Sequence, residues 1–131
     1  ININKMKTQL KQVEEFHNAF GQVNGTEPQL LKEDAFELRH RLMKEENDEY
    51  LEACWNGDLV QVADALGDEL YILLGTMLKH GLQDKIEEIF NEIHNSNMSK
   101  LDAEGKPIFR EDGKILKGPN YFKPNIFKIL E

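Results

Sequence analysis

The sequence predicts an all-α fold, a bundle of four to five helices followed by a short C-terminal β-hairpin or extended arm. Apolar residues recur at helical spacing in four segments, glycine ends three of them, and the pattern changes after Leu101. With 131 residues, 40% of them hydrophobic, the chain is expected to form one domain. Its helical core should span residues 8–100 and its arm residues 101–131.

The first two helices are marked by their terminators. The first is expected from about Thr8 to Phe20, where Gly21 ends the apolar pattern. The second is expected from about Glu33 to Trp55 and is followed by Asn56-Gly57, a helix-ending pair. Between them lies a polar loop with glycine and proline.

The third and fourth helices follow a short link. Asp58 is a good N-cap, and Gln61 three residues on forms a capping-box-like pair with it. The third helix should run to His80 and, being apolar nearly all round, should be central and buried. The fourth is expected over residues 83–95.

The C-terminal arm has a different pattern. Ile108-Phe109 and Ile115-Leu116 flank Asp112-Gly113, a two-residue turn signal that predicts a short hairpin. The tail over residues 117–131 contains two prolines and is expected to be extended and docked.

Charge and composition exclude several functions. The net charge of −8 and the acidic pI near 5.0 argue against binding to nucleic acid or anionic membranes. Cys54 is the single cysteine, so no internal disulfide is expected and a reducing compartment fits. No segment has the length of a membrane span or the pattern of a signal peptide, so we expect a cytoplasmic soluble protein.

Acidic residues on the second helix lie where apolar ones are expected. On a helical wheel, Glu45 and Glu49 fall within roughly 40° of Leu38 and Leu42, and Glu46 lies about 80° from Leu38. Carboxylates on a core-facing stripe are costly unless a cation or hydrogen bonds compensate them. The pattern therefore predicts a bound cation. Arg39, six residues before the cluster, could bond a carboxylate or a phosphate, and of these an ion pair is expected.

The third helix carries a second acid pair. Asp64 and Asp68 are four residues apart and therefore point the same way. If the two helices are antiparallel, both acid sets meet across their interface and suit Mg²⁺, with Mn²⁺ as an alternative. Two simpler interpretations remain: the glutamates form a solvated face, or Asp64 is a core acid bonded to tyrosine or lysine.

The acid pattern resembles a known family. Glu45-Glu46-Asn47-Asp48-Glu49 is similar to the E-E-x-x-E element of the all-α nucleoside triphosphate pyrophosphohydrolases, the MazG-like proteins related to dimeric dUTPases and phosphoribosyl-ATP pyrophosphohydrolase. Their second element, E-x-x-D, resembles Ala65-Leu66-Gly67-Asp68, in which alanine replaces the glutamate and Asp64 lies one residue earlier. The resemblance covers about residues 8–100.

The resemblance implies a metal site and a reaction. Glu46, Glu49 and Asp68 would hold Mg²⁺, with Asp64 as an inferred fourth ligand. Glu45 would be a ligand or orient a water molecule, so Glu45, Glu46, Glu49 and Asp68 form the predicted catalytic set. The implied reaction splits a nucleoside triphosphate between its α- and β-phosphates into a monophosphate and pyrophosphate.

Substrate contacts are expected after the fourth helix. Asn97 and Lys100 resemble the N-x-x-K element of related enzymes, and Lys100 could meet a phosphate. Lys117 and Tyr121 lie in a segment that resembles the tail of a MazG-like subgroup and could close over a nucleotide. The alternative interpretation is an exposed, lysine-rich tail.

The expected partners are a nucleotide and further copies of the chain. The apolar third helix predicts a homodimer or homotetramer, since one small subunit can hardly cover it. A modified nucleotide or a phosphoribosyl compound is a further substrate class. The competing hypothesis is a non-catalytic helical module whose acids form a salt-bridged interface with a partner.

Overall fold

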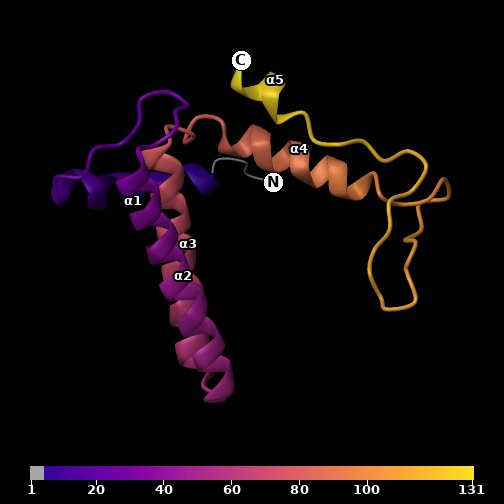
Figure 1. Ribbon diagram of the computed structural model, residues 1–131, viewed down its shortest axis with the longest axis horizontal. Coiled ribbons are helices and arrows are strands. Elements are labelled where there is room, and N and C mark those ends of the chain that lie inside the picture. Colours follow the sequence, from indigo (N-terminus) through magenta and orange to yellow (C-terminus); the bar gives the residue numbers. More distant parts are fainter. Residues whose placement is uncertain (1–4) are drawn as a thin grey trace. The chain divides into compact units, whose positions relative to one another are not determined.

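The computed structural model describes residues 5–131, and their ordered elements are α-helices (Figure 1). Contacts divide the chain into two compact units, unit 1 up to Asp84 and unit 2 from Lys85 to Glu131. The all-α prediction is confirmed. None of the helices in this part of the chain combines the length and the apolarity needed to cross a bilayer. The helices are α1 Lys5–Ala19, α2 Glu33–Trp55, α3 Leu59–Lys79, α4 Ile86–Met98 and α5 Ile126–Leu130.

The centre of unit 1 is an antiparallel hairpin of α2 and α3, which pack along their length (Figure 1). The link between them is short because Gly57 adopts a φ of 64°, which a residue with a side chain rarely accepts. Asp58 caps α3 as predicted, since its carboxylate accepts hydrogen bonds from the backbone N–H groups of Val60 and Gln61 at 3.0 and 3.2 Å.

The return bond of the predicted capping box is not formed. The backbone N–H of Asp58 already donates to the carbonyl of Ala53, at 3.3 Å. The Gln61 side chain instead accepts a hydrogen bond from the Asn56 amide across the link, at 3.3 Å. This bond connects the end of α2 to the first turn of α3, at the tip of the hairpin.

The buried face of α2 differs from the one predicted. Leu38 is 44% exposed, whereas its neighbour Arg39 is only 7% exposed. The Arg39 guanidinium donates to the Thr76 hydroxyl at 3.0 Å and to the Ile72 carbonyl at 2.9 Å, and it forms no ion pair with the described residues. The prediction of an ion pair for Arg39 is wrong, because α3 supplies uncharged acceptors for its guanidinium.

Helix α1 packs against α3 near the open end of the hairpin, opposite its tip (Figure 1). Gly75 allows this close approach, because a Cβ there would lie 2.8 Å from Arg39 Nη2 and 3.0 Å from His17 Nε2. His17 is buried and bonded through Nδ1 to the Asn24 side chain at 2.6 Å. The buried apolar side chains of this unit are Leu10, Val13, Ala53, Ala65, Leu74 and Leu78.

Helix α3 is not buried on all sides, contrary to the expectation from its sequence. Val60 is 79% exposed, Leu66 48% and Leu70 51%. Helix α2 covers one side of α3 and α1 covers part of another, which leaves an apolar face of α3 uncovered within unit 1.

Unit 2 consists of α4, an irregular segment and α5, which contacts α4. Helix α4 begins at Ile86, three residues later than predicted. The predicted turn at Asp112-Gly113 is present, but among the described residues the hairpin amounts to one antiparallel bridge between Phe109 and Ile115. The tail docks as expected, since Ser96 Oγ donates to the carbonyl of Phe122 at 2.9 Å. It is not extended throughout as predicted, because residues Ile126–Leu130 form α5, where the Asn125 side chain accepts a hydrogen bond from the backbone N–H of Lys128.

Candidate metal centre

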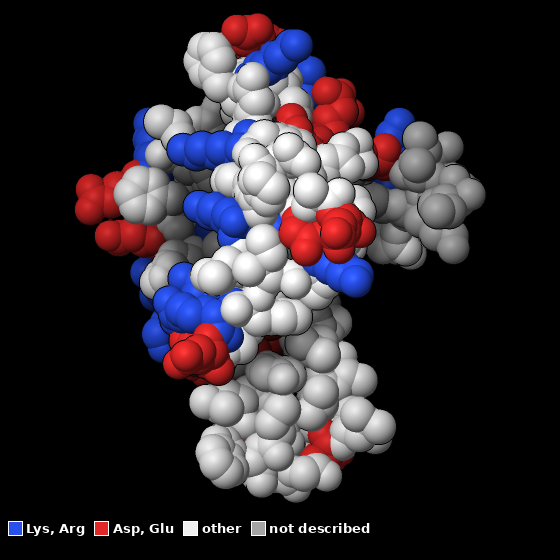
Figure 2. All heavy atoms as spheres, turned by 90° about the vertical axis from the view of Figure 1, so that its right-hand side faces the viewer, with Lys and Arg blue, Asp and Glu red and all other residues white. Residues whose placement is uncertain are grey.

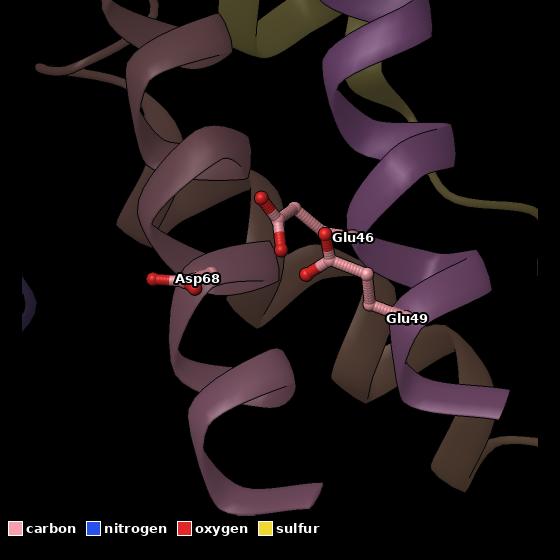
Figure 3. Close-up of side chains that lie close together, drawn as sticks. All are labelled: Glu46, Glu49 and Asp68. Carbon is pink, nitrogen blue, oxygen red and sulfur yellow. The ribbon is translucent and has the colours of Figure 1, made fainter. Parts of the chain in front are cut away.

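Three carboxylates of the hairpin converge (Figure 3). Glu46 and Glu49 extend from α2, and Asp68 comes from α3; one oxygen of each lies within 4.8 Å of the others. Residues three apart share a helix face, and the antiparallel hairpin brings that face to the second helix. Glu46 is half-buried, while Glu49 and Asp68 are exposed, so the group of three (the acidic triad) is open to solvent on one side.

The carboxylates of the acidic triad repel one another, and a cation between them would relieve this repulsion. Burial raises the pKa of Glu46 to about 7, with further contributions from a hydrogen bond to Glu49 and from the charges of Glu49, Asp68 and Glu45. Glu46 Oε2 is buried and has no hydrogen-bond partner. A buried acceptor without a donor is costly, and either a proton or a metal ion can compensate it.

The acidic triad fits a small divalent ion. Around an octahedral Mg²⁺ with bonds of about 2.1 Å, adjacent oxygens are roughly 3.0 Å apart and opposite oxygens roughly 4.2 Å apart. The oxygens of the triad all lie within 4.8 Å of one another, so they would move closer together to bind one ion. Three carboxylate oxygens are also the ligand type that Mg²⁺ and Mn²⁺ prefer.

Two predicted acids lie outside the triad. Asp64, four residues before Asp68, is not part of it and instead lines a neighbouring hollow together with Glu49. Glu45 is exposed, and its charge acts on Glu46. The structure therefore brings together three of the four predicted ligands, and the ligand role of Asp64 stays a prediction.

The predicted substrate residues all belong to unit 2, at one end of α4. The backbone N–H of Lys100 donates to the carbonyl of Asn97 at 3.2 Å. Lys117 Nζ lies 4.8 Å from the centre of the Tyr121 ring, within the range of a cation–π contact. Gly118 brings the segment of Lys117 and Tyr121 next to Lys100. Its backbone lies against the carbonyls of Lys100 and Leu101, with no room for a side chain.

Sequence reasoning missed the polar residues around the hollow, namely Glu52, Asn56 and Gln61. Glu52 lies three residues after Glu49, on the same face of α2, and this spacing could have indicated it. The sequence pattern indicates Asn56 only as part of the terminator of the second helix and Gln61 only as the capping partner of Asp58. The short link between the two helices brings their side chains together.

Comparison with known proteins agrees with this geometry. A sequence profile described as phosphoribosyl-ATP pyrophosphohydrolase matches residues 13–97, the segment that contains the whole acidic triad. A crystal structure of a "putative NTP pyrophosphohydrolase" from Exiguobacterium sp. 255-15 is similar in fold, with a TM-score of 0.50 and 23% identity over 91% of this chain and 90% of that one. Comparison with the curated proteins gives no match. Because the profile spans more than half of the sequence, the chain belongs to the phosphoribosyl-ATP pyrophosphohydrolase family, an all-α family of pyrophosphohydrolases.

Proposed function

We propose that this protein hydrolyses a nucleoside triphosphate, or a related nucleotide, at the bond between the α- and β-phosphates, with Mg²⁺ as the required ion. The observation that carries this proposal is the convergence of Glu46, Glu49 and Asp68 across the hairpin. Family membership supports the reaction class, and the raised pKa of Glu46 supports a cation at this place. Mn²⁺ would suit the same ligands.

The roles of the residues follow from their positions. Glu46, Glu49 and Asp68 hold the ion, which when bound neutralises phosphate charge and makes a water molecule more acidic. Glu45, exposed beside Glu46, orients the attacking water and accepts its proton. The water oxygen forms a new bond to phosphorus, and the bond from that phosphorus to the α–β bridging oxygen breaks. If the α-phosphorus is attacked, pyrophosphate leaves with the bridging oxygen. If the β-phosphorus is attacked, pyrophosphate carries the water oxygen. The second product is the nucleoside monophosphate.

Unit 2 would supply the positive charges for the phosphates. Lys100 is proposed to contact a phosphate as a point charge, and Asn97 lies three residues before it at the end of α4. Lys117 and Tyr121 are proposed to complete the contacts to the nucleotide, since Gly118 fixes their segment against the backbone of Lys100.

We propose that the protein works as a homodimer or homotetramer in the cytoplasm. The exposed apolar side chains of α3, among them Leu66 and Leu70, would be covered by a second copy. Cys54 is free and exposed, which suits a reducing compartment. Removal of unwanted nucleotides from the cellular pool is the proposed role.

Phosphoribosyl-ATP is a second candidate substrate, favoured by the profile that matches the chain. It contains the same α–β bond, so the acidic triad would act on it in the same way. Phosphoribosyl-ATP differs from ATP by a phosphoribosyl group on the adenine, and a direct comparison of its turnover with that of the nucleoside triphosphates decides between the candidates.

The experiment is a substrate panel with millimolar Mg²⁺, containing the common nucleoside triphosphates and phosphoribosyl-ATP and assayed for both pyrophosphate and orthophosphate. We expect pyrophosphate and a monophosphate in equal amounts, and no turnover after chelation of the metal. Glu49→Gln is the matched control, because it removes one triad charge at an exposed position. Release of orthophosphate, or absence of any turnover across the panel, would overturn the proposal and favour the non-catalytic module.

A further inference from the structure

A hollow of about 300 Å³ adjoins the acidic triad on the side of the hairpin tip. Glu49 belongs to both, and the other lining residues lie closer to the tip on both helices. Ala53 lies one helical turn beyond Glu49, and Ala65 lies about one turn before Asp68. All of these residues belong to unit 1, so the hollow is a feature of the hairpin itself.

Two small side chains line the hollow, one from each helix. Ala53 and Ala65 are buried, at 3% and 4% exposure. A longer side chain at either position would occupy space that is open here, so the two alanines leave room for a ligand.

Charge is distributed unevenly along the hairpin. Residues 47–68, from the triad to the tip and back, include six acids and no Lys, Arg or His. The basic residues of α2 all precede the triad, at positions 39–44, and the basic residue of α3 is Lys79 at its far end. In Figure 2 the hairpin tip, at the bottom of the view, has acidic atoms and no basic ones on this face.

This asymmetry decides which end of a nucleotide the hollow can accept. A triphosphate carries several negative charges and would be repelled by Glu49, Glu52 and Asp64, which all line the hollow. A nucleoside is neutral, and the volume matches the lower end of ligand pockets in proteins. We propose that the hollow binds the nucleoside end of the substrate, while the phosphates extend from the triad toward the open end of the hairpin. This inference rests on the proposed function.

The lining also indicates which nucleosides fit. Ionised Glu52 and Asp64 can only accept hydrogen bonds, so they match ribose hydroxyls and the exocyclic amino groups of cytosine, adenine and guanine. Uracil and thymine present a carbonyl oxygen where cytosine has its amino group, and this oxygen would face a carboxylate. The amides of Asn56 and Gln61 both donate and accept, so they can bond either kind of base, and the preference comes from the carboxylates.

The first test blocks the hollow without touching the triad. In Gln61→Trp, a bulky ring replaces an exposed lining side chain, and Gln12→Trp on α1 is the matched control outside the hollow. We expect Gln61→Trp to raise the KM for CTP at least about tenfold, with an unchanged inhibition constant for inorganic tripolyphosphate, which lacks a nucleoside. If both constants rise equally, or neither changes, the hollow does not hold the nucleoside.

The second test changes one charge and covers the case in which Gln61→Trp fails to fold. Wild-type kcat/KM for CTP should exceed that for UTP about tenfold, and Glu52→Gln should bring the ratio close to one, because an amide can also donate to the uracil carbonyl. Glu37→Gln, an exposed acid of α2 outside the hollow, should keep the ratio. If the wild type releases pyrophosphate with no preference for CTP, this inference alone is overturned.

If the wild type releases no pyrophosphate, the proposed function is overturned. Tighter binding of cytidine than of uridine to the Mg²⁺-loaded protein would then still support nucleoside binding in the hollow.

Discussion

The two units of the chain differ sharply in charge. Residues 1–84 contain sixteen acidic and eight basic residues, whereas residues 85–131 contain eight of each. The whole net charge of −8 therefore lies in unit 1, together with the acidic triad. Unit 2 carries the four residues predicted to bind substrate, two of them lysines. Under the proposed function, this contrast in charge assigns the cation to unit 1 and the contacts to the anionic substrate to unit 2.

The largest effect is expected from neutralising the triad. Glu49→Gln or Asp68→Asn should lower kcat by more than about 100-fold, because each removes a charged oxygen that holds the ion. The fold should be retained, and the metal-free form should be no less stable, since repulsion among the carboxylates is relieved. Turnover and thermal unfolding of the purified variants check both points. Full activity of Asp68→Asn would remove that residue from the site.

Added Mg²⁺ should stabilise the protein through unit 1. At an ion concentration of about 100 times Kd, stabilisation by binding is about 2.7 kcal/mol, which raises the melting temperature on the order of 10 °C in a domain of this size. Thermal unfolding at pH 8 with and without Mg²⁺ measures the shift. Glu49→Gln is the control and should show a much smaller shift. An equal shift in the variant would place the ion elsewhere, and no shift in the wild type would favour a salt-bridged interface.

The affinity for Mg²⁺ should depend on pH because Glu46 must lose its proton to bind the ion. The pKa of its carboxyl is raised from 4.5 to about 7 in the folded protein, so affinity should fall about tenfold for each pH unit below 7. Without metal, this group stabilises the fold most below pH 4.5, and the contribution is lost as pH rises through 7. Calorimetric titrations between pH 5.5 and 8 test the first statement, and Glu46→Gln should flatten the metal-free stability profile.

A smaller effect is expected in unit 2. Lys100→Ala should lower kcat/KM about tenfold, since one charged contact to a phosphate is lost, while Mg²⁺ binding stays unchanged. Lys106→Ala, an exposed lysine of the same segment, is the matched control. Steady-state kinetics of both variants provide the measurement. If the two behave alike, Lys100 does not contact the substrate, and the functional contrast between the units would be lost.

The smallest effect concerns the packing of the hairpin. Thr76→Val removes the hydroxyl that accepts from Arg39 Nε and donates to the Ile72 carbonyl, while it keeps the shape of the side chain. The buried guanidinium then loses one of its two bonds, and stability should fall by about 1–2 kcal/mol. Urea denaturation measures this loss. Unchanged stability would show that water replaces the hydroxyl at this position.

Much of unit 1 could be predicted because local signals determine it. The C-terminal end of α2 and the cap of α3 follow from Gly57 and Asp58, whose effects act within a few residues. The triad could be predicted in the same way, since the spacing of Glu46 and Glu49 fixes one face and the short link brings Asp68 opposite. No knowledge of distant contacts was needed for these steps.

The remaining features depend on contacts between segments that are distant in sequence. The wheel predicts Leu38 inside, and the position of Arg39 predicts an ion pair, because neither can show that Ile72 and Thr76 supply uncharged acceptors. Likewise, the apolar sequence of α3 predicts burial, but among the described helices of unit 1, α1 and α2 cover it only in part. The hollow is lined by residues of both helices, so neither helix reveals it alone.

The most direct measurement is a crystal structure of the protein grown with Mn²⁺, with anomalous diffraction recorded to locate the ion. We predict an anomalous peak bonded to carboxylate oxygens of Glu46, Glu49 and Asp68, at the meeting point of α2 and α3. A peak at any other site, or carboxylates of these three residues that stay free of metal at saturating Mn²⁺, would contradict the account.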